Sequence, residues 1–191
     1  MTTKFNAVVL GNDFYSRYNL HSGKESSVAV FLFDEYLNEE RLFLLENFSS
    51  QCGIIEVLFP NSGQDINRYI LETEKVLQEL RSVHGKFVLV AFGRIAPSIV
   101  KLLSGGLTAT KLIMVNPEFD SDIITLLSKI DIPSLIISST REKNGYNIDS
   151  VKYHDLMSSS SITYIRQTTG NPLFEKFTQS FNSMLKFLAD E

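Results

Sequence analysis

Short, strongly apolar segments alternate along the chain with longer segments of helical periodicity, and this alternation restricts the fold more than any other feature. Several apolar segments, such as residues 87–92, carry apolar side chains at nearly every position. Strands of that kind are buried on both faces, as in a parallel sheet that lies between helices. The sequence predicts strands over residues 5–10, 27–33, 54–59, 86–92, 111–115, 134–138 and 161–166.

The intervening segments repeat apolar residues at helical spacing. In the C-terminal segment Asn171 suits an N-cap, Pro172 suits the first helical position, and one apolar stripe follows as far as Leu188. Further helices are predicted over residues 38–48, 66–83, 95–103, 121–130 and 148–158. No linker or shift in composition interrupts the alternation. The sequence therefore predicts one domain over residues 1–191, an α/β fold with a doubly wound, mostly parallel sheet and helices on both faces.

The composition excludes several classes of protein. Of the 191 residues, 43% are hydrophobic and 21% are charged, which is typical of a globular chain and argues against disorder. The net charge of −4 and the scattered basic residues argue against a nucleic-acid partner. A single cysteine, Cys52, excludes a disulfide framework. Because no apolar run approaches the ~18 residues of a membrane span and no secretory signal is visible, we expect a soluble, cytoplasmic protein.

Doubly wound sheets bind ligands at the carboxyl ends of their strands, so a functional motif is expected where a strand leads into a helix. No such junction carries the glycine patterns that bind dinucleotides or nucleoside triphosphates. The three histidines, His21, His84 and His154, are not spaced as metal ligands and are interpreted as structural surface residues. The sequence predicts neither a cofactor nor a metal.

The most informative junction is FVLVAFGRIAPS, residues 87–98, in which a buried strand runs through a sharp turn directly into a helix. From this junction the sequence resembles the α/β-hydrolase superfamily, and the resemblance extends along most of the chain. In that superfamily the junction is the nucleophile elbow, G-x-S-x-G. Here residues 91–95 read A-F-G-R-I, and Gly93 stands at the nucleophile position. Glycine tolerates the positive φ of such an elbow but supplies no nucleophile.

The resemblance assigns roles to three other junctions. Asp34 and Glu35 follow the strand whose loop supplies an oxyanion-hole amide in the superfamily. Glu142 follows the strand that ends in the superfamily's catalytic acid, and Asn171 stands in the place of its histidine. An asparagine does not shuttle protons near neutral pH, and its simpler interpretation is the N-cap of the last helix. Without a histidine to orient, Glu142 is interpreted as a solvated loop charge.

The predicted site is therefore altered in charge as well as in its nucleophile. Asp34 and Glu35 would place negative charge where an oxyanion forms, which opposes acyl transfer. The predicted pocket lining consists of Asp34, Glu35, Phe92 and Arg94, and we hypothesise that Arg94 pairs with one of the two acids. Only residues 116–120 separate the strand at 111–115 from the next helical pattern, which is too short for the superfamily's lid. We expect a shallow, open site.

Two functions of different classes follow. The first is a catalytically degenerate α/β-hydrolase-like protein that binds a protein partner or a small molecule, as the superfamily's non-catalytic members do. The second is an active, esterase-like serine hydrolase with a displaced nucleophile, for which the candidates are Ser62, Ser98, Ser138 and Ser139 with His154 as base. A flavodoxin-like binding protein is a third alternative, which fits the strand that begins after Pro133 and the final helix less well.

Overall fold

The computed structural model describes the central and C-terminal parts of the chain most fully. The described residues are 5–9, 15–19, 28–34, 48, 53–59, 71, 74–75, 77–78, 87–141, 148–167 and 177–189. Of the residues singled out in the sequence, Glu35, Glu142 and Asn171 lie outside these ranges, as do Cys52, Ser62, His21 and His84.

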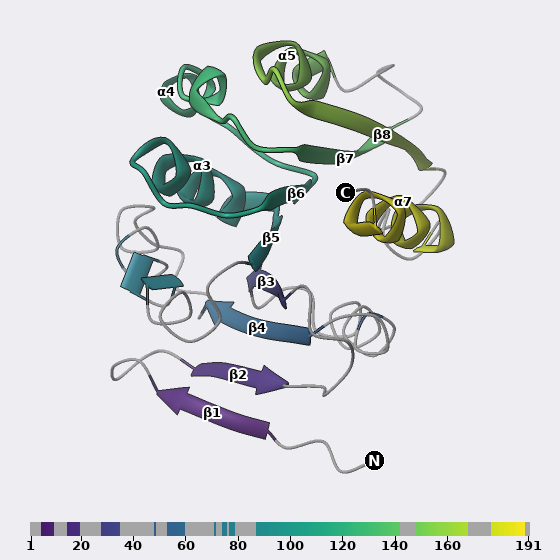
Figure 1. Ribbon diagram of the computed structural model, residues 1–191. Coiled ribbons are helices and arrows are strands. Elements are labelled where there is room, and N and C mark those ends of the chain that lie inside the picture. Colours follow the sequence, from purple (N-terminus) through teal and green to yellow (C-terminus); the bar gives the residue numbers. More distant parts are fainter. Residues whose placement is uncertain are drawn as a thin grey trace.

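The described strands form one eight-stranded sheet (Figure 1). Its spatial order is β1-β2-β4-β3-β5-β6-β7-β8. The strand β2 is antiparallel to both of its neighbours, and every pair from β4 to β8 is parallel. The strands are β1 (Phe5–Val9), β2 (Tyr15–Asn19), β3 (Val28–Asp34), β4 (Gly53–Phe59), β5 (Phe87–Phe92), β6 (Lys111–Val115), β7 (Ser134–Arg141) and β8 (Ser160–Gln167).

The central strand β5 shows why helices must pack on both faces of the sheet. All six of its residues are buried. Phe87, Leu89 and Ala91 belong to one hydrophobic cluster, whereas Val88, Val90 and Phe92 belong to a second. Because side chains alternate across a strand, the two clusters lie on opposite faces of the sheet. A strand with no polar face is stable only between two layers of helices.

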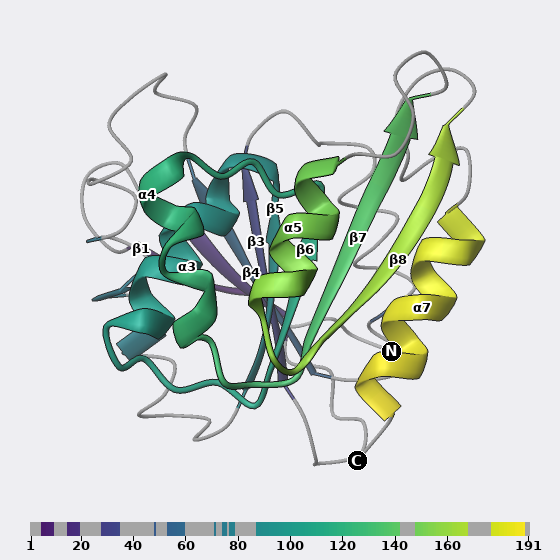
Figure 2. The ribbon, with the colours of Figure 1, turned by 90° about the horizontal axis from the view of Figure 1, so that it is seen from above.

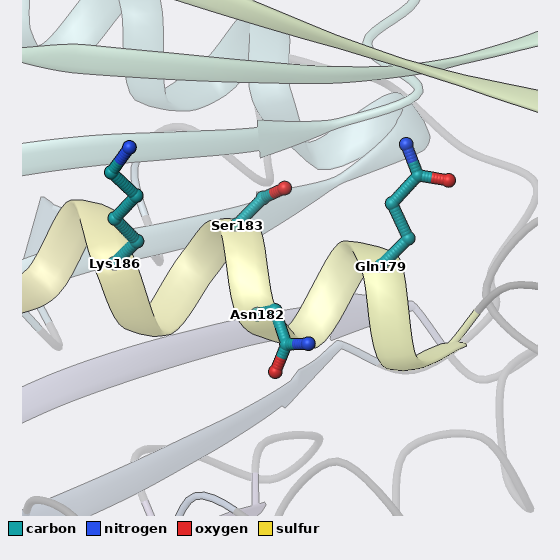
Figure 3. Close-up of a pocket in the computed structure, with 4 residues that line it drawn as sticks. All are labelled: Gln179, Asn182, Ser183 and Lys186. Carbon is teal, nitrogen blue, oxygen red and sulfur yellow. The ribbon is translucent and has the colours of Figure 1, made fainter.

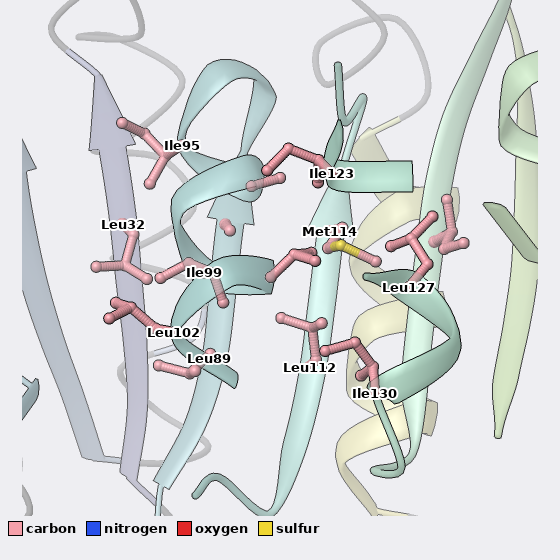
Figure 4. Packing of buried hydrophobic residues seen from close by; sticks show 14 of the residues in the cluster. Leu32, Leu89, Ile95, Ile99, Leu102, Leu112, Met114, Ile123, Leu127 and Ile130 are labelled. Carbon is pink, nitrogen blue, oxygen red and sulfur yellow. The ribbon is translucent and has the colours of Figure 1, made fainter. Parts of the chain in front are cut away.

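The helices cover both faces as expected (Figure 1). The cluster that contains Leu89 is closed by α3 (Ala96–Ser104), α4 (Ser121–Ile124), the 3-10 turn η3 (Leu127–Lys129) and α5 (Ile148–Leu156). Figure 4 shows α3 and α4 packing their aliphatic side chains on this face. The opposite cluster is closed by α7 (Phe177–Ala189), whose Met184 is fully buried. The predicted fold class, a doubly wound and mostly parallel α/β sheet, is confirmed.

Most predicted strands lie within a few residues of the observed ones, but β2 was not predicted. Its sequence, YSRYN, lacks the alternation of apolar and polar residues that marks a half-buried strand. Its pairing with β1 and β4 therefore comes from the sheet and not from local pattern. The strand β7 is also three residues longer than predicted and ends at Arg141.

One predicted helix differs in extent from what the structure shows. The segment predicted as one helix over 121–130 contains the short helix α4 and, after a break, η3. The carboxylate of Asp120 caps α4 by accepting a hydrogen bond from the backbone N–H of Ile123 at 3.0 Å.

Residues 116–120 join β6 to α4 directly. The absence of a lid and the single domain over 1–191 stay predictions. Most of the predicted helices 38–48 and 66–83, and the start of the last helix, lie outside the described residues.

Candidate functional site

The carboxyl end of β5 leads into a sharp turn at Gly93. Gly93 has φ +48°, in the left-handed region, and begins a 3-10 turn, η2 (Gly93–Ile95), that continues into α3. The backbone N–H of Ala96 donates to the carbonyl oxygen of Gly93, which closes the turn. A Cβ atom at Gly93 would meet no other described residue within 4 Å, its two chain neighbours apart. The turn thus has the backbone of an elbow and no side chain at its tip.

The register of the sheet places two further residues beside Gly93. Leu32 of β3 pairs with Ala91, and continuing this register by two residues sets Asp34 opposite Gly93. On the other side Phe92 pairs with Val115, so Asn116 follows at the same level as Gly93. Asn116 also has a positive φ, +46°, and its backbone N–H donates to the carbonyl oxygen of Ile137 at 2.8 Å. The three strand ends form one edge, where doubly wound sheets bind ligands.

The side chains next to Gly93 point to different surroundings. Phe92 is only 3% exposed and belongs to the core cluster under α7. Arg94 is exposed at the start of the turn. Three of the predicted pocket residues are described. Asp34 ends β3, Phe92 ends β5 and Arg94 follows Gly93, so all three positions lie at the same edge of the sheet.

Two candidate nucleophiles are enclosed in the core. The Ser98 side chain is fully buried in the first turn of α3, and its hydroxyl has no hydrogen-bond partner among the described residues. Ser138, near the end of β7, is also fully buried, and its Oγ contacts the Oγ of Ser150 in α5. Neither hydroxyl has a described histidine as its partner. A buried hydroxyl without a base is not an activated nucleophile.

A serine–histidine contact does occur in the described part of the chain, at the opposite edge of the sheet. The Nδ1 atom of His154 lies 2.7 Å from the Oγ of Ser160. Ser160 begins β8 beside Ser134, which begins β7, so the contact lies at the amino ends of the strands. The sequence interpretation of His154 as a base did not anticipate this partner. The sequence feature that could have indicated this contact is a histidine in the last turn of a predicted helix, followed by a run of serines.

The Ser160 hydroxyl also contacts two backbone carbonyl oxygens at the end of α5. It lies within 3.1 Å of the His154 carbonyl oxygen and 3.0 Å of the Met157 carbonyl oxygen. The hydroxyl has one proton and three acceptors within reach, so the tautomer of His154 decides whether Nδ1 donates to Oγ or accepts from it.

A surface hollow of about 510 Å³ lies along α7 (Figure 3). The residues lining it in the described part of the chain are all polar and come from this one helix: Gln179, Asn182, Ser183 and Lys186. Their spacing puts them on the side of α7 opposite Phe181, Met184 and Leu188, which pack on the sheet. These four residues therefore form the polar face of an amphipathic helix.

The described residues carry neither a metal centre nor a membrane helix. Among them, no three His, Cys, Asp or Glu side chains come together as a set of metal ligands. Within the same ranges, no helix has the length and apolar character that crossing a membrane requires.

Comparison with known proteins gives structural matches only. No model of a protein family matches the chain, and no curated protein matches it. An alpha-beta serine hydrolase homologue from Coxiella burnetii superposes with a TM-score of 0.77 at 13% identity, over 99% of each chain. A predicted CIB-like hydrolase from Thermoplasma acidophilum gives a TM-score of 0.73 at 14% identity, over 98% of each chain. Est1E from Butyrivibrio proteoclasticus gives 0.74 at 10% identity, over 97% of this chain and 99% of that one.

These matches run over nearly the full length of both chains. Identities this low establish the fold and not the chemistry. The chain has the α/β-hydrolase fold.

Proposed function

We propose that this protein is a catalytically degenerate α/β-hydrolase-fold protein that acts by binding a protein partner or a small molecule in the cytoplasm. The observation that carries the proposal is Gly93, which stands at the tip of the elbow with φ +48° and has no side chain to attack a substrate. A serine or cysteine at such a position bears backbone strain for the sake of its chemistry. Glycine retains the backbone shape without the strain and without the nucleophile.

The hydroxyl groups elsewhere in the described residues support the same proposal. Ser98 and Ser138 are buried, and Ser160, which contacts His154, lies at the amino ends of the strands. An esterase needs a hydroxyl in contact with a base at a place that substrate reaches. The binding role is proposed for the carboxyl edge around Gly93, Asp34 and Asn116, because ligands of doubly wound sheets bind there.

The alternative is an active serine-type hydrolase, esterase-like, with a displaced nucleophile. The names of the matched structures favour it, since they are described as a serine hydrolase homologue and a hydrolase. Of the candidates, Ser62 and the side chain of Ser139 lie outside what the structure describes. The alternative requires one of the candidate serines to approach a histidine.

Hydrolysis of p-nitrophenyl acetate and butyrate separates the two functions. The proposal predicts that the purified protein releases nitrophenol at the rate of the buffer blank. Ser62→Ala, Ser98→Ala, Ser138→Ala and Ser139→Ala serve as matched variants. A rate above the blank that one of these substitutions abolishes would identify the displaced nucleophile and overturn the proposal. A rate that all four variants share would point to a contaminant, which a second purification step would remove.

A binding measurement tests the positive half of the proposal. Native mass spectrometry of the protein as purified reports any small molecule or protein that remains bound. Gly93→Leu would fill the open space above the turn, and Lys129→Leu on exposed η3 is the control. The proposal predicts that Gly93→Leu lowers the bound fraction at least tenfold and that the control does not. Equal occupancy in both variants would place the binding site elsewhere.

A further inference from the structure

We draw no further inference here: the strongest candidate, the two-stranded extension of β7 and β8 past the end of β6 (residues 138–141 with 164–167, Figure 2), carries nothing because nothing in the described part of the structure shows what covers its edge.

Discussion

Gly93 and Asn116 lie side by side at the carboxyl edge of the sheet, and both have a left-handed backbone, with φ +48° and φ +46°. The two adjacent central strands, β5 and β6, therefore end in the same conformation. Asparagine tolerates this region better than most residues because its short polar side chain bonds locally. The pair fixes the direction in which the chain leaves the sheet at the proposed binding edge.

Substitutions at Asn116 test this backbone constraint. We expect Asn116→Ala to lower the free energy of unfolding by about 1 kcal/mol more than Asn116→Gly does. Both variants lose the amide side chain, so the difference between them isolates the cost of φ +46° for a residue with a Cβ. Urea denaturation followed by circular dichroism gives both values. Equal destabilisation by the two variants would show that the backbone at Asn116 relaxes freely.

Gly93→Ala tests whether a side chain at this turn is disfavoured by backbone strain or by lack of space. A Cβ at Gly93 meets no described residue within 4 Å beyond its chain neighbours, so we expect a loss of about 1 kcal/mol from the positive φ alone. Gly93→Asn should cost less, because asparagine enters this region more readily. Denaturant unfolding measures both variants. A loss several times larger for alanine would mean that a neighbouring group crowds the turn.

Lys111 joins the start of β6 to the end of α7. Its ammonium group donates to the carbonyl oxygens of Phe187 at 2.8 Å and Leu188 at 3.2 Å, and lies 5.4 Å from the centre of the Phe187 ring. A cation at a helix C-terminus satisfies carbonyls that have no partner within the helix. We expect Lys111→Met to lower the free energy of unfolding by about 1–2 kcal/mol.

Lys129→Met is the control for that prediction, since Lys129 is exposed on η3. It should change stability by less than about 0.5 kcal/mol. Hydrogen exchange adds a local readout, because the amides of α7 should lose protection in Lys111→Met. Equal free energies of unfolding for the two lysine variants would show that the contact between Lys111 and α7 does not stabilise the fold.

The buried hydroxyl pair Ser138–Ser150 predicts strong coupling between β7 and α5. Replacing either serine by alanine leaves the other hydroxyl buried without its partner, at a cost of about 1–3 kcal/mol. The double variant removes both polar groups and should cost less than the sum of the single variants. A double-mutant cycle measures the difference. Additive effects would contradict a hydrogen bond between the two side chains.

The sequence predicts those parts of the fold that depend on local pattern. The strand β6 was predicted at its observed bounds, and β5 within one residue, because uninterrupted apolar runs identify a strand covered on both faces. The glycine turn was located because a strand, a single glycine and a helix follow without a gap. The sequence does not predict the strand β2, because its extended conformation depends on pairing with β1 and β4 and not on a pattern in its own residues.

The long-range contacts between strands and helices could not be predicted from the sequence, for a different reason. Ser138 and Ser150 are twelve positions apart, and Lys111 is 76 positions from Phe187. Such pairs depend on how β7 meets α5 and how β6 meets α7, and no periodicity encodes that. The same holds for His154, whose contact with Ser160 depends on how α5 meets the start of β8.

The measurement that tests the central claim most directly is labelling of the purified protein with a fluorophosphonate, read by intact mass. An active serine esterase labelled in parallel shows that the reagent is competent. Because the turn after β5 carries glycine, which has no side chain to react, we expect the mass to remain unchanged after prolonged exposure. A stoichiometric adduct on one residue would reveal an activated hydroxyl and contradict the account of a degenerate elbow.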